Sequence, residues 1–126
     1  MDTFVNGAGA TGTSLLNHWG HILKLAFGAT AYHVGSSTKS KTWRDVDVRM
    51  LLDDKQWEEI IGCSPSNAFQ INVRWECLTL AISLWGEKVT GLPIDFQFQP
   101  IEWANKKYPI KDGCWRNPLM IHLVDV

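Results

Sequence analysis

The chain has 126 residues, of which 45% are hydrophobic and 20% are charged, as expected for one globular domain with a substantial core. A formal net charge of −1 at pH 7 excludes an overall positive field for nucleic acid or membranes, so only a local patch could attract a polyanion. No apolar run approaches the roughly 18 residues of a membrane-spanning helix. The first residues lack the basic and then apolar segments of a signal peptide, so we do not expect one. Three cysteines without CxxC spacing, Cys63, Cys77 and Cys114, favour the reducing cytoplasm.

The first half of the chain predicts two helices with two strands between them. Residues 1–12 are small and rich in glycine, and we expect a flexible leader there. Apolar residues at helical spacing then predict a helix with Thr13 or Ser14 as N-cap and Gly28 as its end. The expected elements are a helix over 13–27, a buried strand over 29–34, a loop or helical turn over 36–44, a strand over 45–52 and a helix from Asp53-Asp54 to Gly62.

The second half predicts a largely buried helix, a strand and a C-terminal extension over residues 101–126. Strict alternation after Pro93 places Ile94, Phe96 and Phe98 on one face of a strand, opposite Asp95, Gln97 and Gln99. The expected elements are a helix over 71–88, a strand over 92–99, a short helix over 101–110 and an edge strand over 119–126. The order of elements predicts an α/β (α+β) domain, a small mixed sheet flanked by helices.

Two aspartates, Asp45 and Asp47, occupy alternate positions of the second predicted strand. Side chains at positions i and i+2 of a strand point to the same face, about 6.5 Å apart. Carboxylates at that separation repel each other and lose solvation when the face is covered, so the pair favours a neutralising cation beside it. Lysines and an arginine in the preceding Gly-Ser loop add positive charge suited to phosphate.

Three segments in order resemble the core motif of the nucleotidyltransferase superfamily (DNA polymerase beta-like): Val34-Gly35-Ser36, Asp45-Val46-Asp47-Val48 and Ile94-Asp95-Phe96. That motif is a hydrophobic residue with Gly-Ser, then Asp-hydrophobic-Asp-hydrophobic, then a third acidic residue on a later strand. The chain is most similar to minimal single-domain members, and the similarity spans about residues 13–100. Many relatives carry Arg directly after Gly-Ser, where this chain has Ser37.

The resemblance implies a magnesium-dependent enzyme that transfers a nucleoside monophosphate from an NTP, such as ATP, to an acceptor hydroxyl. Asp45, Asp47 and Asp95 would be catalytic residues that bind a pair of Mg²⁺ ions, with Mn²⁺ as an alternative, and Asp95 would also accept a proton. The expected nucleotide-binding and phosphate-binding residues are Gly35, Ser36, Ser37, Lys39, Lys41, Arg44 and Arg49. Arg49 could instead pair with the aspartates and lower their pKa values.

Two other functions fit the same residues. One is a non-catalytic interaction module of this fold, regulatory or antitoxin-like, that masks a helical HEPN-type protein partner. The other is a metal-dependent phosphohydrolase that directs water at a phosphate. Few residues remain after the core, so a protein partner or a second copy of the chain would supply the acceptor surface. Nucleic acid is a further possible partner, and a membrane is not expected.

Other motifs favour structural roles. Gly7–Gly12 matches GxGxxG, but no acidic residue follows at the spacing of a dinucleotide site. The segment 35–42 has Ser40 where a Walker A loop needs its second glycine, and a strand rather than a helix follows it. His18 and His21 have a metal-compatible spacing but no nearby acidic partner, and His33 fits a core histidine. Trp43 could stack on a base or cover the core.

Overall fold

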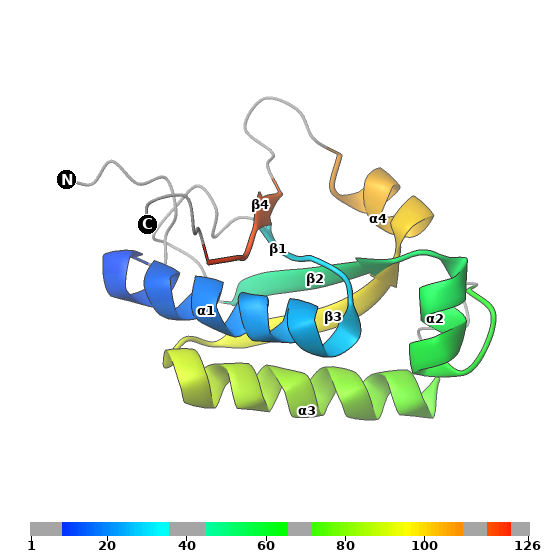
Figure 1. Ribbon diagram of the computed structural model, residues 1–126, viewed down its shortest axis with the longest axis horizontal. Helices are drawn as coiled ribbons and strands as arrows, with labels where there is room; N and C mark the ends of the chain where they lie inside the picture. Colours follow the sequence, from blue (N-terminus) through cyan, green and yellow to red (C-terminus); the bar gives the residue numbers. More distant parts are fainter. Residues whose placement is uncertain (1–8, 36–44, 66–71, 110–115, 122–126) are drawn as a thin grey trace.

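The computed structural model describes residues 9–35, 45–65, 72–109 and 116–121, with side chains from residue 12 onward. These residues form a four-stranded mixed sheet in the order β3-β2-β1-β4, with helices packed on it (Figure 1). The elements are α1 (Gly9–Phe27), β1 (Ala31–Val34), β2 (Val46–Leu52), α2 (Asp54–Ile61), α3 (Val73–Thr90), β3 (Ile94–Pro100), α4 (Ile101–Lys107) and β4 (Asn117–Pro118). The predicted α/β class is therefore confirmed. No helix in the described ranges is long and apolar enough to cross a membrane.

One face of the sheet carries the core. The helices α1 and α3 lie side by side beneath this face in Figure 1, and aromatic residues of β3 pack edge-to-face with those of α1. Phe96 and Phe98 are fully buried there, as are Val48 and Met50 of the neighbouring strand β2. The predicted alternation of β2 and β3 is therefore confirmed, because every second residue faces this core.

The predicted boundaries of α2 are also confirmed. Asp53 accepts a hydrogen bond from the backbone N–H of Gln56, whose side chain in turn accepts one from the backbone N–H of Asp53. This reciprocal capping box satisfies two backbone donors at the start of the helix. At the other end Gly62 adopts a left-handed conformation, which glycine reaches without the steric cost of a side chain.

The start of α1 differs from the prediction. The helix begins at Gly9, so residues 9–12 of the expected leader are helical, and Thr13 and Ser14 lie within the helix rather than at its N-cap. Ala10 favours helix and no proline interrupts the segment, so its glycines weaken the first turn without ending it. Residues 1–8 of the expected leader, and the expected loop over 36–44, lie outside the described residues.

The helix α3 is less buried than predicted. Its inward stripe contains Ser83, Gly86 and Thr90, whereas Leu80 and Leu84 are 62% and 55% exposed. No side chain fits at Gly86, because a Cβ there would lie 2.6 Å from the Trp19 ring. The apolar residues that suggested burial therefore lie largely on the outer face, since the sheet covers only one side of this helix.

In the described part of the C-terminal segment, the edge strand lies before the predicted one. It is Asn117–Pro118, paired with His33 and Tyr32 of β1, and residues 119–121 are not in a strand. Proline lacks the N–H of a central strand and is tolerated at an edge. Leu119 instead packs into the core against Gly20, whose missing side chain leaves room for it. Residues 122–126 lie outside the described residues.

Candidate active site

The candidate site is on the sheet face opposite α1 and α3. The strands β2 and β3 are parallel neighbours, and their register places Asp47 directly beside Asp95. On the other side of β2, Asp47 pairs in register with Val34, the residue before Gly35. Paired residues of adjacent strands share a face. The fold thus brings together one residue from each of the three segments that the sequence analysis singled out.

Gly35 lies against the carboxylate of Asp47. Its φ of +83° is in the left-handed region, and a Cβ at this position would lie 2.5 Å from Asp47 Oδ2. Glycine is therefore needed twice over, for the backbone conformation and for the close approach of the side chain. The turn that ends β1 therefore packs directly against Asp47 of β2.

Arg49 lies between the two paired carboxylates. Its Nη2 atom is 3.3 Å from Asp95 Oδ2 and 3.8 Å from Asp47 Oδ1, while its Nη1 donates to the backbone carbonyls of Val48 and Asp95. The arginine is 4% exposed, so these bonds hold a nearly buried guanidinium in place. Of the two roles expected for Arg49, the structure therefore has the ion pair, made with Asp47 and Asp95.

The pKa of the Asp47 carboxyl is raised above its usual value, contrary to the expected lowering. Burial is the largest cause, because the charged form loses hydration. The positive charge of Arg49 lowers the pKa, but the negative charges of Asp95 and Asp45 oppose it. The single guanidinium of Arg49 therefore neutralises only part of the negative charge of Asp45, Asp47 and Asp95.

Asp45 precedes β2 and is exposed, close enough to Asp47 to influence its titration. In the described part of the chain, no three His, Cys, Asp or Glu side chains approach closely enough to form a metal cluster. The described geometry is thus a register pair, Asp47 and Asp95, with a third carboxylate beside it.

The remaining predicted residues divide into two groups. The phosphate-binding candidates Ser36, Ser37, Lys39, Lys41 and Arg44 lie outside the described residues, as does Trp43. The three histidines in the described residues lie away from the carboxylates of the site. His18 and His21 are on α1, and His33 is fully buried on the core face, where burial lowers its pKa to about 4.

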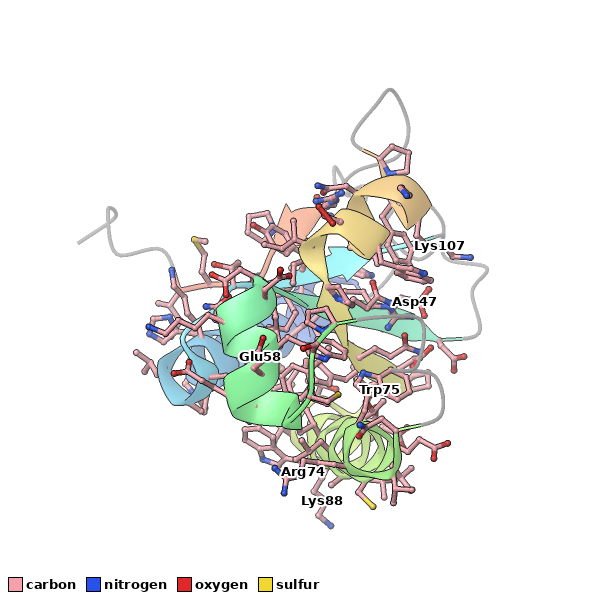
Figure 2. The ribbon with its side chains drawn as sticks, turned by 90° about the vertical axis from the view of Figure 1, so that its right-hand side faces the viewer. Asp47, Glu58, Arg74, Trp75, Lys88 and Lys107 are labelled. Carbon is pink, nitrogen blue, oxygen red and sulfur yellow. The ribbon has the colours of Figure 1, made fainter. Side chains whose placement is uncertain are left out.

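The sequence analysis missed the contribution of α4 and of the segment after it. Tyr108 accepts a hydrogen bond from Arg49 Nε at 3.3 Å, and its ring lies 5.8 Å from the guanidinium carbon. Arg116 in turn donates to the backbone carbonyl of Tyr108. Figure 2 shows Asp47 between α4 and α3, with Lys107 extending from α4 on the same side. An aromatic residue next to a basic pair, Lys106-Lys107, was the available signal.

No protein-family model matches the chain, and neither a curated protein nor a solved structure matches it.

Proposed function

We propose that the protein is a divalent-metal-dependent nucleotidyltransferase that joins a nucleoside monophosphate to an acceptor hydroxyl. The observation that carries this proposal is the register pair of Asp47 and Asp95 on parallel neighbouring strands, with the left-handed Gly35 against the Asp47 carboxylate. Such an arrangement places two oxygen ligands beside a glycine turn whose backbone a phosphate can approach closely.

The reaction follows from the proposed roles of these residues. The acceptor oxygen forms a bond to the α-phosphorus of the NTP, the bond from that phosphorus to the bridging oxygen breaks, and pyrophosphate leaves. Asp95 takes the proton of the acceptor hydroxyl; its side chain is 38% exposed and therefore accessible to an acceptor. Arg49, held by Tyr108, keeps the carboxylates in position, and Gly35 allows the Asp47 carboxylate to lie close to the turn that would bind phosphate.

The residues fit a magnesium ion by the chemistry of their donors. Mg²⁺ takes oxygen ligands and is often held by one or two carboxylates together with substrate phosphates, so it does not require a ready-made cluster of three acidic side chains. Asp47 and Asp95 would hold the ion, with Asp45 as a further ligand. When bound, the metal would neutralise charge on the transferred phosphate and on the leaving group.

A second candidate function is a non-catalytic interaction module. The observation in its favour is Arg49, which already supplies a positive charge between Asp47 and Asp95. A guanidinium fixed by four hydrogen-bonding contacts can neutralise part of an acidic site without any metal. In that case the acidic face is structural, and nucleotides do not bind to it.

Isothermal titration of the full chain with each NTP, in the presence and absence of Mg²⁺, tests the proposal. We expect binding that needs Mg²⁺ and that is lost in Asp45→Asn and Asp47→Asn. Glu58→Gln is the matched control, since it removes an exposed carboxylate on α2, which Figure 2 shows away from Asp47.

Three results would count against the transferase. Metal-dependent binding that survives both asparagine substitutions would place the nucleotide elsewhere. No binding at millimolar nucleotide would favour the interaction module. Release of a nucleotide or phosphate without any acceptor adduct would favour a phosphohydrolase.

A further inference from the structure

A shallow groove runs from the candidate site along α3. It lies between this helix and the free edge of β3, and its walls combine carboxylates with exposed apolar side chains. The lining residues that give the groove its chemistry are Asp45, Glu76, Leu80, Leu84, Glu87 and Asp95. Two of the carboxylates belong to the candidate site, so the groove and the site are continuous.

The groove is strongly acidic. Its lining includes the four carboxylates of Asp45, Glu76, Glu87 and Asp95, and none of its described lining residues is Lys, Arg or His. The nearby basic residues Arg74 and Lys88 extend from the side of α3 that faces away from Asp47 in Figure 2. Charge complementarity therefore favours a cationic occupant and opposes a nucleic-acid strand.

The groove is also apolar along α3. Leu80 and Leu84 line it although they are 62% and 55% exposed, and the Trp75 ring forms part of its wall. Small polycations such as polyamines would leave these leucines in water. A polypeptide that carries both basic and apolar side chains would cover the leucines and neutralise the carboxylates.

An extended peptide cannot extend the sheet at this edge. The Ser83 hydroxyl accepts from the backbone N–H of Phe96 at 2.9 Å and lies 3.4 Å from the Phe96 carbonyl, to which it donates. The Trp75 indole donates to the Phe98 carbonyl at 2.8 Å. These side chains occupy three of the backbone groups that an added strand would need, which favours binding through side chains.

A helix suits this surface better than a strand. The lining residues of α3 recur from Glu76 to Glu87 at spacings of three and four, along one face of the helix. Over these residues the groove is about 17 Å long, which is about three helical turns. An amphipathic helix presents its side chains with the same spacing.

We propose that the groove binds a basic, amphipathic helix of a partner protein, and that this helix carries the acceptor hydroxyl to Asp95. The second clause rests on the proposed function, whereas the first does not. The partner's lysines or arginines would lie beside Glu76 and Glu87, and its apolar residues would cover Leu80 and Leu84.

A random library of helix-length peptides, selected against the full chain, tests the binding. We expect the enriched peptides to be cationic and to carry apolar residues at spacings of three and four. Affinity should fall about fivefold to tenfold in Glu76→Gln/Glu87→Gln, because two exposed ion pairs each make a small contribution. A similar loss is expected in Leu80→Asn/Leu84→Asn.

Matched controls are Glu58→Gln on α2 and Leu25→Asn on α1, both exposed residues outside the groove. Neither should change the affinity of the enriched peptides. The proposal is overturned when the library yields no binder, when enriched peptides lack positive charge, or when groove and control variants bind them equally. It is also overturned when sedimentation shows that a second copy of the chain occupies this face, or when a single-stranded oligonucleotide competes for the groove.

The transfer step has a separate readout. Enriched peptides with Ser, Thr or Tyr are incubated with Mg²⁺ and α-labelled NTP, and we expect the label on the peptide. Peptide binding without labelling, together with absent nucleotide binding, would contradict the proposed function and leave the groove assignment intact. Nucleotide binding with no groove-dependent peptide binding would contradict the groove assignment and leave the proposed function intact.

Discussion

The two faces of β2 and β3 meet very different surroundings although their residues alternate along the same two strands. The side chains of Val48 and Phe96 are buried in the apolar core beside α1 and α3, where packing decides which side chain fits. Their neighbours Asp47 and Asp95 lie on the other face, where an arginine partly neutralises them. The first face stabilises the fold through apolar packing, whereas the second brings like charges together, which lowers stability.

This difference predicts that substitutions on the two faces change stability by different amounts and, in one case, in opposite directions.

Phe96→Ala should be the most damaging change. The ring is fully buried between α1 and the sheet and packs edge-to-face with Trp19 and Phe98, so its loss leaves a cavity. We expect the free energy of unfolding to fall by about 3–5 kcal/mol, measured by urea denaturation. Gln97→Ala, at the next position on the other face, is the control and should cost less, about 1–2 kcal/mol, because the buried Gln99 amide loses its acceptor. Equal losses in the two variants would contradict the comparison.

Arg49→Met should lower the free energy of unfolding by about 2 kcal/mol at neutral pH. The methionine keeps much of the apolar stem but leaves Asp47 and Asp95 without their shared positive partner. Because those carboxylates are partly exposed, the loss should be smaller than for a fully buried pair. It should also shrink as the pH falls and the carboxyls become protonated. A loss that does not depend on pH would show that Arg49 acts through packing alone.

Gly35→Ala should lower the free energy of unfolding by about 1–2 kcal/mol. Alanine at a left-handed φ is strained, and its Cβ would meet the Asp47 carboxylate. Gly28→Ala is a matched control, because this glycine also has a positive φ but a Cβ there would extend into open space. We expect similar backbone strain in both variants, but the contact with Asp47 and the loss of metal-dependent nucleotide binding in Gly35→Ala alone. Unchanged nucleotide binding in Gly35→Ala would show that Gly35 is not part of the nucleotide-binding site.

Asp47→Asn should have the smallest effect on stability, and in the opposite direction. The raised pKa means that the folded chain binds the Asp47 proton more tightly than the unfolded chain does. This carboxyl therefore stabilises the fold at a pH below its unfolded pKa, and that contribution is lost as the pH rises through the folded pKa.

In metal-free buffer at neutral pH, Asn should thus raise the free energy of unfolding by up to about 1 kcal/mol, since solvent screens the partly exposed group. The gain should disappear below about pH 4, where the native carboxyl is protonated too. Thermal melts of both proteins across this range measure it. A variant that is less stable at neutral pH would contradict the assigned direction.

Several features of the fold and the site followed from the sequence because they depend on local patterns of residues. Alternation in β2 and β3 predicted which side chains share a face, and Asp53 and Gly62 predicted both ends of α2. The contribution of α3 was misjudged for a physical reason. Periodicity identifies an apolar stripe but does not say which stripe faces the sheet, and here small residues such as Gly86 are the ones that fit.

By itself, the sequence determined the α/β class, the strands that carry the acidic residues and the faces on which those residues lie, because side-chain direction follows from the strand period of two. Only the tertiary structure decided that β2 and β3 are parallel neighbours with Asp47 beside Asp95, since register depends on contacts between distant segments. It also decided that Arg49 lies between the two carboxylates and that Tyr108 contacts it from the far end of the chain. Such pairings depend on packing in three dimensions, and no local pattern of residues specifies them.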